Sequence, residues 1–229
     1  MIRTIAFAAA SATFLLAASL PARAVDDEIM QAQAGIWLLA PENGAPGCRL
    51  TFDKSQTSSG YALSGAQACK TTLPAVAGAV AWNIGDDGSL FLADVTAKVL
   101  IRFQAEEGSP WESEEGEPIW LLPALGDLDH VPTVANIAGS WQLQTPNGKA
   151  VCAITFSADT DKDGTPKMSP GSDCPADIAE LKLSLWAMEG FGLVLLGNDG
   201  SSLSFDMRAD GSFQKSDEEE GDPLLLVRK

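Results

Sequence analysis

Apolar and polar residues alternate along much of the chain, which is the pattern of strands with one face on a core and the other in water. Asn-Gly and Asp-Gly pairs lie between many of these stretches, and such pairs favour tight hairpin turns. The segment 175–183 is the one candidate for a helix. The alternation is clearest over residues 37–39, 48–52, 61–63, 90–92, 99–103, 120–122, 141–143, 152–156, 194–196, 203–207 and 225–227.

Aromatic and cysteine positions of the first half recur in the second half at an almost constant offset. Three of the pairs are 104 positions apart and the fourth is 105 apart, so the chain contains two copies of one unit. About eight short strands in each unit of roughly 100 residues fit a small antiparallel up-and-down barrel, which has no open edge. The pairs are Trp37 and Trp141, Cys48 and Cys152, Cys69 and Cys174, and Trp82 and Trp186.

The N-terminal 24 residues have the organisation of a secretory signal peptide. Arg3 precedes an uncharged apolar stretch, and Ala22-Arg23-Ala24 forms a small-x-small cleavage site. A membrane anchor is the alternative, but the stretch is rich in Ala and Ser and of borderline length for a span. We therefore expect cleavage after residue 24, no transmembrane segment in the product, and a periplasmic or secreted location.

Export places the four cysteines in an oxidising compartment, where they can form disulfides. Four cysteines allow three pairings, and the duplication favours the local one, Cys48 with Cys69 and Cys152 with Cys174. Each bridge would close a loop of about 20 residues and contribute about 3 kcal/mol in the chain-entropy model. The absence of a CxxC motif argues against metal-binding or catalytic thiols.

The composition disfavours several classes of function. Among its 229 residues, 31 are acidic and 15 basic, a formal net charge of −16 that makes nucleic acid a poor partner. A single histidine, His130, and the lack of catalytic motifs argue against an enzyme, and we expect no cofactor. Asp159, Asp161 and Asp163 alternate as in a calcium loop, but Pro170 stands where a bidentate Glu belongs, so a plain turn is favoured over a metal site.

The tryptophans and the acidic clusters have ordinary interpretations. The four tryptophans shared by the copies are expected in the cores, whereas Trp111, which has no counterpart, is a candidate for an exposed contact. Acidic residues cluster near 106–107, 112–117 and 217–222, and we expect solvated faces there. The alternative is a surface that steers a basic partner.

Both copies resemble the alkaline proteinase inhibitor (Inh) family. The resemblance is carried by Ala34-Gly35-x-Trp37-x-Leu39, the spaced cysteines, Gly60-Tyr61-x-Leu63, Leu73-Pro74 and Asp87-Gly88-x-Leu90-x-Leu92-x-Asp94. It implies two lipocalin-shaped eight-stranded barrels with one disulfide each. The boundary between the copies gives the domains: a signal peptide at 1–24, a first barrel domain with an N-terminal trunk at 25–123, a linker at 124–135 and a second barrel domain at 136–229.

The resemblance also implies a function, inhibition of secreted zinc metalloproteases of the serralysin type. In that family the trunk ahead of the first strand enters the protease cleft while the barrel braces it. The matching segment here is 25–33, expected to be flexible, with Val25, Asp26, Asp27, Glu28, Ile29 and Met30 as the protease-contact residues. We expect a monomer. The alternatives are a carrier of a small apolar ligand and an envelope-associated structural or interaction protein.

Overall fold

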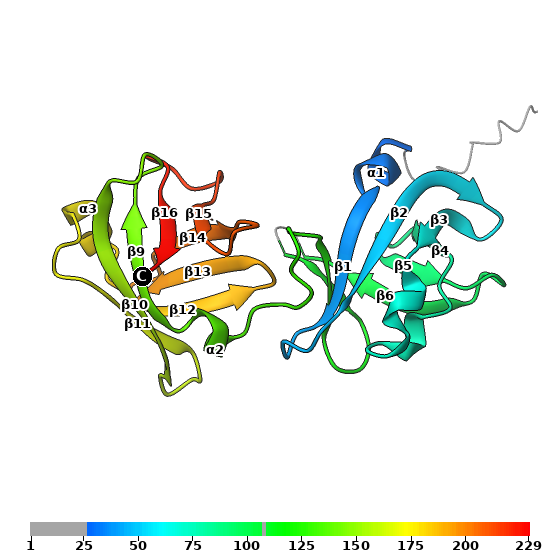
Figure 1. Ribbon diagram of the computed structural model, residues 1–229, viewed down its shortest axis with the longest axis horizontal. Helices are drawn as coiled ribbons and strands as arrows, with labels where there is room; N and C mark the ends of the chain where they lie inside the picture. Colours follow the sequence, from blue (N-terminus) through cyan, green and yellow to red (C-terminus); the bar gives the residue numbers. More distant parts are fainter. Residues whose placement is uncertain (1–26, 107–108) are drawn as a thin grey trace, which may run out of the picture.

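The computed structural model describes residues 27–106 and 109–229, and Figure 1 shows two barrels lying side by side. Each barrel is closed by eight antiparallel strands that follow one another in chain order, as predicted. The first consists of β1 (Gly35–Pro41), β2 (Cys48–Thr57), β3 (Gly60–Ser64), β4 (Ala81–Ile84), β5 (Leu90–Ala93), β6 (Val99–Gln104), β7 (Trp111–Ser113) and β8 (Ile119–Pro123). The second consists of β9 (Gly139–Gln144), β10 (Ala150–Thr160), β11 (Pro166–Pro170), β12 (Leu183–Glu189), β13 (Gly192–Gly197), β14 (Ser202–Met207), β15 (Phe213–Lys215) and β16 (Leu225–Arg228).

Helices are short and lie at the ends or sides of the barrels. Each barrel is preceded by one, α1 (Asp27–Ala32) before β1 and α2 (Val134–Ile137) before β9. The predicted helix at 175–183 is present as α3 (Ala176–Glu180), and the first copy has two 3₁₀ turns in its place, η1 (Ala66–Lys70) and η2 (Pro74–Val76). No helix within 27–106 or 109–229 is both long and apolar enough to cross a membrane.

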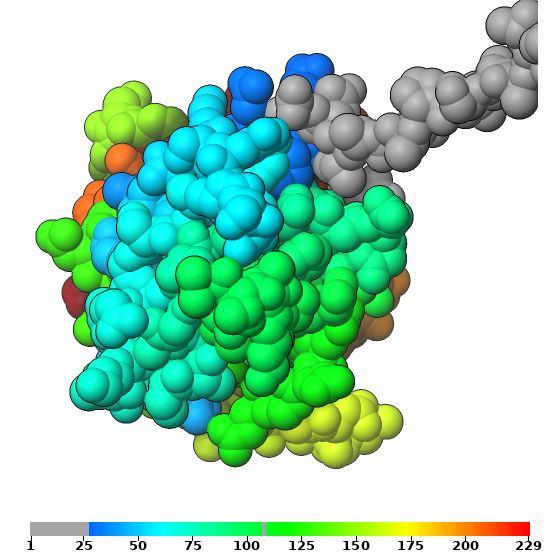
Figure 2. All heavy atoms as spheres, turned by 90° about the vertical axis from the view of Figure 1, so that its right-hand side faces the viewer, coloured from blue at the N-terminus to red at the C-terminus, as the bar shows by residue number. Residues whose placement is uncertain are grey.

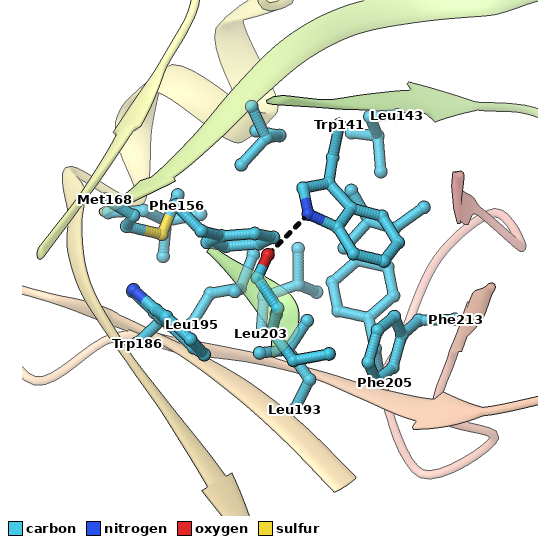
Figure 3. Packing of buried hydrophobic residues seen from close by; sticks show 14 of the residues in the cluster. Trp141, Leu143, Phe156, Met168, Trp186, Leu193, Leu195, Leu203, Phe205 and Phe213 are labelled. Carbon is cyan, nitrogen blue, oxygen red and sulfur yellow. Dashed lines mark hydrogen bonds between the residues drawn. The ribbon is translucent and has the colours of Figure 1, made fainter. Parts of the chain in front are cut away.

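Side chains fill the interior of each barrel. In the first, Phe52 stacks between Trp37 and Trp82, with ring centroids 5.6 and 4.9 Å away. In the second, Trp141 meets Phe156 and Phe213 edge to face (Figure 3). The four shared tryptophans are all buried, as predicted, while Trp111 is half-buried against the first core.

One disulfide fastens each barrel. Cys48 pairs with Cys69 and Cys152 pairs with Cys174, which confirms the local pairing. Each bridge ties the start of the second strand of its barrel to the segment that follows the third strand. A small barrel has a limited core, so such a cross-link contributes a large share of its stability.

The linker between the barrels is attached to the first barrel and packs on the second. Arg49 on β2 donates to the carbonyl oxygens of Gly126 and Leu128, at 2.5 and 3.0 Å. The backbone N–H of Gly47 donates to the carbonyl of Asp129 at 2.6 Å. Leu128 also packs against the core of the second barrel. The linker therefore holds the two barrels together rather than merely spanning the space between them.

A small third core lies where the barrels meet. Leu38 and Leu122 point away from the interior of the first barrel, yet both are buried, because the linker residue Val131 and Phe191 of the second barrel cover them. Gly190, in the turn between β12 and β13, fits closely there. A Cβ built on it would approach a methyl carbon of Leu122 at 2.7 Å.

Candidate functional site

The segment that precedes β1 is the first candidate site. Val25 and Asp26 lie outside the described residues, and the backbone is helical from Asp27 onward, so the expectation of a flexible segment through 25–33 is wrong from that point. Glu28 and Ile29 are exposed, whereas Met30 is only 2% exposed and belongs to the core of the first barrel. Met30 therefore cannot touch a partner while α1 stays in place.

Two interactions place α1 against the first barrel. The thioether of Met30 packs among the core residues, where an unbranched, polarisable side chain adapts well to an irregular gap. The indole Nε1 of Trp37 donates a hydrogen bond to the carbonyl oxygen of Gln33, four residues earlier in the chain, at 2.8 Å. The first core tryptophan therefore fixes the segment that leads into its own strand.

The second copy has the same arrangement with more restraints. Trp141 Nε1 donates to the carbonyl of Ile137 at 2.8 Å (Figure 3), and Thr133 with Asn136 forms a capping box at the start of α2. Arg228 donates to the carbonyls of Asn136 and Ala138, and its guanidinium carbon lies 5.0 Å from the centroid of the Trp141 ring. The final strand of the chain thus holds α2 in place, and α2 follows the linker rather than a chain end.

The loop from Asp159 to Gly164 has the geometry of an ordinary turn. Asp161 Oδ1 accepts hydrogen bonds from the backbone N–H groups of Asp163 and Thr165, both at 2.9 Å. Those bonds, the one from Thr165 first, hold the pKa of Asp161 below its ordinary value. No group of three or more His, Cys, Asp and Glu side chains suited to a metal ion occurs within the two described ranges.

His130 lies in the linker and pairs with its neighbour. Its Nδ1 is 2.8 Å from Asp129 Oδ1, and this contact lowers the pKa of Asp129. The Asp129 side chain is exposed and the His130 ring is half-buried, and the pair lies beside the hydrogen bond from the backbone N–H of Gly47 to the carbonyl of Asp129. This position suits a linker residue with a structural role.

Parts of the acidic clusters are bound to their barrels rather than free in solvent. The backbone N–H of Ser204 donates to Glu219 Oε1 at 2.8 Å, and the buried Lys215 donates through Nζ to the carbonyl of Glu220 at 2.9 Å. In the first barrel Glu114 accepts from Gln104 at 2.8 Å and lies 3.8 Å from Arg102. These glutamates help to shape loops at the barrel ends.

Open space lies between the barrels. A cavity of about 480 Å³ is bordered by Pro110 and Leu122 of the first barrel and by Glu189, Phe191 and Met207 of the second. Sequence reasoning missed this junction. The feature of the sequence that could have indicated the junction is the unbroken apolar run from Trp37 to Ala40. In it, Leu38 and Ala40 occupy outward-facing positions that are held by Gln142 and Gln144 in the second copy.

Comparison with known proteins agrees with this architecture. The family model described as protease inhibitor Inh matches residues 28–122 and, separately, residues 131–228. No curated protein matches the chain. The two matched regions coincide with the two barrels and include both entry helices in whole or in large part. The chain therefore belongs to the Inh family of protease inhibitors, and it carries two copies of the family unit in tandem.

Proposed function

We propose that this protein inhibits a secreted zinc metalloprotease of the serralysin type, by inserting the start of its mature chain into the protease cleft. Membership in a family of protease inhibitors is the observation that carries the proposal. A rigid barrel favours this mode of action, because it lowers the entropy lost when a short segment is held in its bound position. The disulfides Cys48–Cys69 and Cys152–Cys174 would also keep the barrels folded, and a folded barrel is a poor substrate for the protease that it meets.

The position of α1 sets the reach of the inserting segment. With cleavage after residue 24, Val25 and Asp26 are the residues ahead of the helix, and two extended residues span about 7 Å. Unwinding α1 through Met30 would extend the segment to about 20 Å, but it would remove Met30 from the core. We favour insertion with α1 folded, so that Val25 supplies the amine and Glu28 and Ile29 contact the rim of the cleft.

The second copy contributes differently under this proposal. Its entry helix continues from the linker and is held by Arg228, so it offers no chain terminus to a catalytic zinc ion. The proposal therefore assigns one inhibitory segment to the protein and predicts one protease molecule bound per monomer.

The test is a titration of two enzymes, a serralysin-type zinc protease and a serine protease. Three forms are compared: the chain beginning at Val25, a form lacking Val25 and Asp26 but retaining α1, and a form acetylated on the amine of Val25. We expect the first form to inhibit the zinc protease stoichiometrically and the other two to be at least tenfold weaker. Equal inhibition by all three forms, or inhibition of the serine protease alone, contradicts the proposed mechanism.

Export to the periplasm or the medium is part of the proposal. It is supported by the features of residues 1–24 and by the use of every cysteine in a disulfide. Cell fractionation followed by N-terminal sequencing tests it, with Val25 expected as the first residue of the exported protein. An uncleaved chain in the cytoplasm contradicts this part of the proposal.

A further inference from the structure

Two Asn-Gly turns occupy equivalent places in the two barrels, and the proposed function uses neither of them. Asn43-Gly44 lies between β1 and β2, and Asn147-Gly148 lies 104 positions later, between β9 and β10. Both glycines have a positive φ, 79° in the first turn and 82° in the second. The N–H of each glycine donates to the carbonyl three residues earlier, that of Pro41 at 3.4 Å and that of Thr145 at 2.9 Å. Because the two turns are built alike, a difference in their reactivity must come from the groups around them.

An asparagine that precedes glycine is open to attack by its own main chain, because glycine has no Cβ to hinder the approach of the backbone nitrogen. The glycine nitrogen loses its proton and bonds to Cγ of the asparagine, which places negative charge on Oδ1. The bond between Cγ and Nδ2 then breaks, and Nδ2 takes up a proton and leaves as ammonia. Water opens the resulting succinimide ring at one of its two carbonyls and gives aspartate or isoaspartate. The reaction needs water and a proton acceptor, but no enzyme and no oxidant.

The turn in the second barrel has hydrogen-bond donors at the oxygen that becomes charged. Asn147 Oδ1 accepts from the hydroxyl of Thr145 at 2.5 Å and from the backbone N–H of Lys149 at 3.3 Å. Donors placed at an oxygen that gains negative charge lower the barrier to acyl transfer. The hydrogen bonds already present in this turn therefore favour attack on the side-chain amide of Asn147.

The turn in the first barrel lacks the shorter of these two hydrogen bonds. Asn43 Oδ1 accepts from the backbone N–H of Ala45 at 3.0 Å, which is the counterpart of the bond from Lys149. Pro41 stands where the second copy has Thr145, and proline has neither a hydroxyl nor a backbone N–H to donate. The two turns thus differ by one hydroxyl group at the reacting amide.

The linker covers the first turn and leaves the second one open. A Cβ built on Gly44 would overlap the methyl carbon of Thr133, whereas nothing lies within 4 Å of the same position at Gly148. Gly44 is half-buried, and both residues of the second turn are exposed. Attack requires the glycine N–H to leave its hydrogen bond so that the nitrogen can approach the side chain. Packing against the linker opposes this motion, while an exposed turn without such contacts opens at low cost.

The course of the chain explains the difference in cover. The β1–β2 turn lies where the linker runs, since the N–H of Gly47 donates to the carbonyl of Asp129. The β9–β10 turn lies at the end of the second barrel opposite α2, because β9 begins beside that helix and runs away from it (Figure 1). Figure 2 looks from the first barrel toward the second, and atoms of the second barrel extend beyond the outline of the first. The second turn is therefore remote from the linker that covers the first.

We propose that Asn147 is a site of spontaneous deamidation, favoured by the hydroxyl of Thr145, and that the linker protects Asn43 from the same reaction. The proposal does not depend on protease inhibition. Each event adds one negative charge to the second barrel. Aspartate keeps the turn, because its carboxylate accepts the same hydrogen bonds as the amide oxygen. Isoaspartate adds a methylene group to the main chain close to the pair of Ala150 with Gln144, and so weakens the start of the β9–β10 hairpin.

Rates of deamidation at the two asparagines of the mature chain test the proposal. The protein is incubated at mildly alkaline pH, either folded or in guanidinium chloride, and is then digested under acidic conditions. Mass spectrometry of the peptides measures the conversion of amide to acid at each site. We expect the reaction at Asn147 to be at least tenfold faster than that at Asn43 in the folded chain. In the unfolded chain the two rates should become similar, because both the hydroxyl contact and the cover by the linker are lost.

Three variants separate the two causes. Thr145→Val removes the hydroxyl and should slow the reaction at Asn147 at least threefold without changing that at Asn43. Thr133→Ser removes the methyl group that covers the first turn but keeps the hydroxyl of the capping box, and it should speed the reaction at Asn43. Ser140→Ala, at an exposed position of β9, is the control and should change neither rate. Circular dichroism and thermal unfolding verify that all three variants fold.

A reaction at Asn147 that outpaces the one at Asn43, and that Thr145→Val slows, supports the proposal. It is overturned if Asn147 remains an amide in the folded chain or if the two sites react at the same rate. An unchanged rate in Thr145→Val, or an equal loss in the control, overturns the role of the hydroxyl. An unchanged rate at Asn43 in Thr133→Ser overturns protection by the linker.

Discussion

Trp141 binds the carbonyl oxygen of Ile137 through its indole Nε1 at 2.8 Å, and this bond joins the core of the second barrel to the helix that enters it. We expect Trp141→Phe to lower the free energy of unfolding by about 2 kcal/mol, because a buried carbonyl loses its donor and the smaller ring leaves a void. Urea unfolding measures this. Trp111→Phe is the control, because Trp111 is only half-buried. An equal loss of unfolding free energy in that variant would contradict a stabilising role for the bond from Trp141 to Ile137.

Met30 and Ile29 are neighbours on α1 with opposite surroundings. We expect Met30→Ala to destabilise the first barrel by about 2 kcal/mol, because its side chain is 2% exposed and packs in the core. Ile29→Ala is expected to change stability by less than about 0.5 kcal/mol, because the side chain is half exposed, while weakening protease inhibition. Thermal unfolding and inhibition assays on both variants separate the two effects. Destabilisation by Ile29→Ala would show that α1 packs differently.

Gly190 and Gly200 both have positive φ angles, 59° and 87°, but only Gly190 touches the first barrel. Alanine at either position is strained by about 1 kcal/mol, because L residues disfavour this region. At Gly190 the added methyl also meets Leu122 at 2.7 Å and Pro110 at 3.1 Å, whereas nothing lies within 4 Å at Gly200. We expect Gly190→Ala to alter the arrangement of the barrels, measured by small-angle scattering, and Gly200→Ala to leave it unchanged. Identical scattering from both variants would show that the junction is not closely packed.

The two disulfides are expected to stabilise their own barrels. Replacing Cys152 and Cys174 by serine should lower the stability of the second barrel by about 3 kcal/mol, since a loop of about 20 residues is no longer closed in the unfolded chain. Amide hydrogen exchange resolved by residue checks this, with protection lost mainly in β9 to β16. The same change at Cys48 and Cys69 should affect β1 to β8. Equal loss in both barrels from either change would indicate that they unfold as one unit.

The stability of the first barrel depends on pH through the carboxyl group of Asp94. The hydroxyl of Thr96, followed by the backbone N–H groups of Lys98 and Thr96, lowers the pKa of Asp94 below its ordinary value of 3.8. Because the pKa of Asp94 is lower in the folded state, the ionised carboxylate stabilises the fold fully above pH 3.8. This stabilisation is lost as the pH falls toward the pKa of the folded state. Carboxyl NMR should give a midpoint below 3.8. Thr96→Val should raise that midpoint, and an unchanged value would contradict the role of the hydroxyl.

The candidate site could be predicted only in part from sequence. The position of the segment ahead of Trp37 follows from the strand pattern, but its conformation does not, because Met30 and Ile29 are both apolar and only packing separates them. Similarly, the predicted strands at 90–92 and 99–103 leave Val95 in the segment that connects them. The bonds from Thr96 and Lys98 that make this turn rigid depend on its folded geometry.

The duplication, the antiparallel barrel of about eight strands in each copy and the local disulfides all follow from the sequence alone, because alternation and spacing are properties of one chain segment and its neighbours. Which apolar residues are covered depends on how distant segments pack in the folded protein. Leu38 and Ile36 lie on the same strand, and both point away from the barrel interior. The first is buried by Val131 and Phe191 and the second is exposed, because covering an outer face requires segments that are distant along the chain.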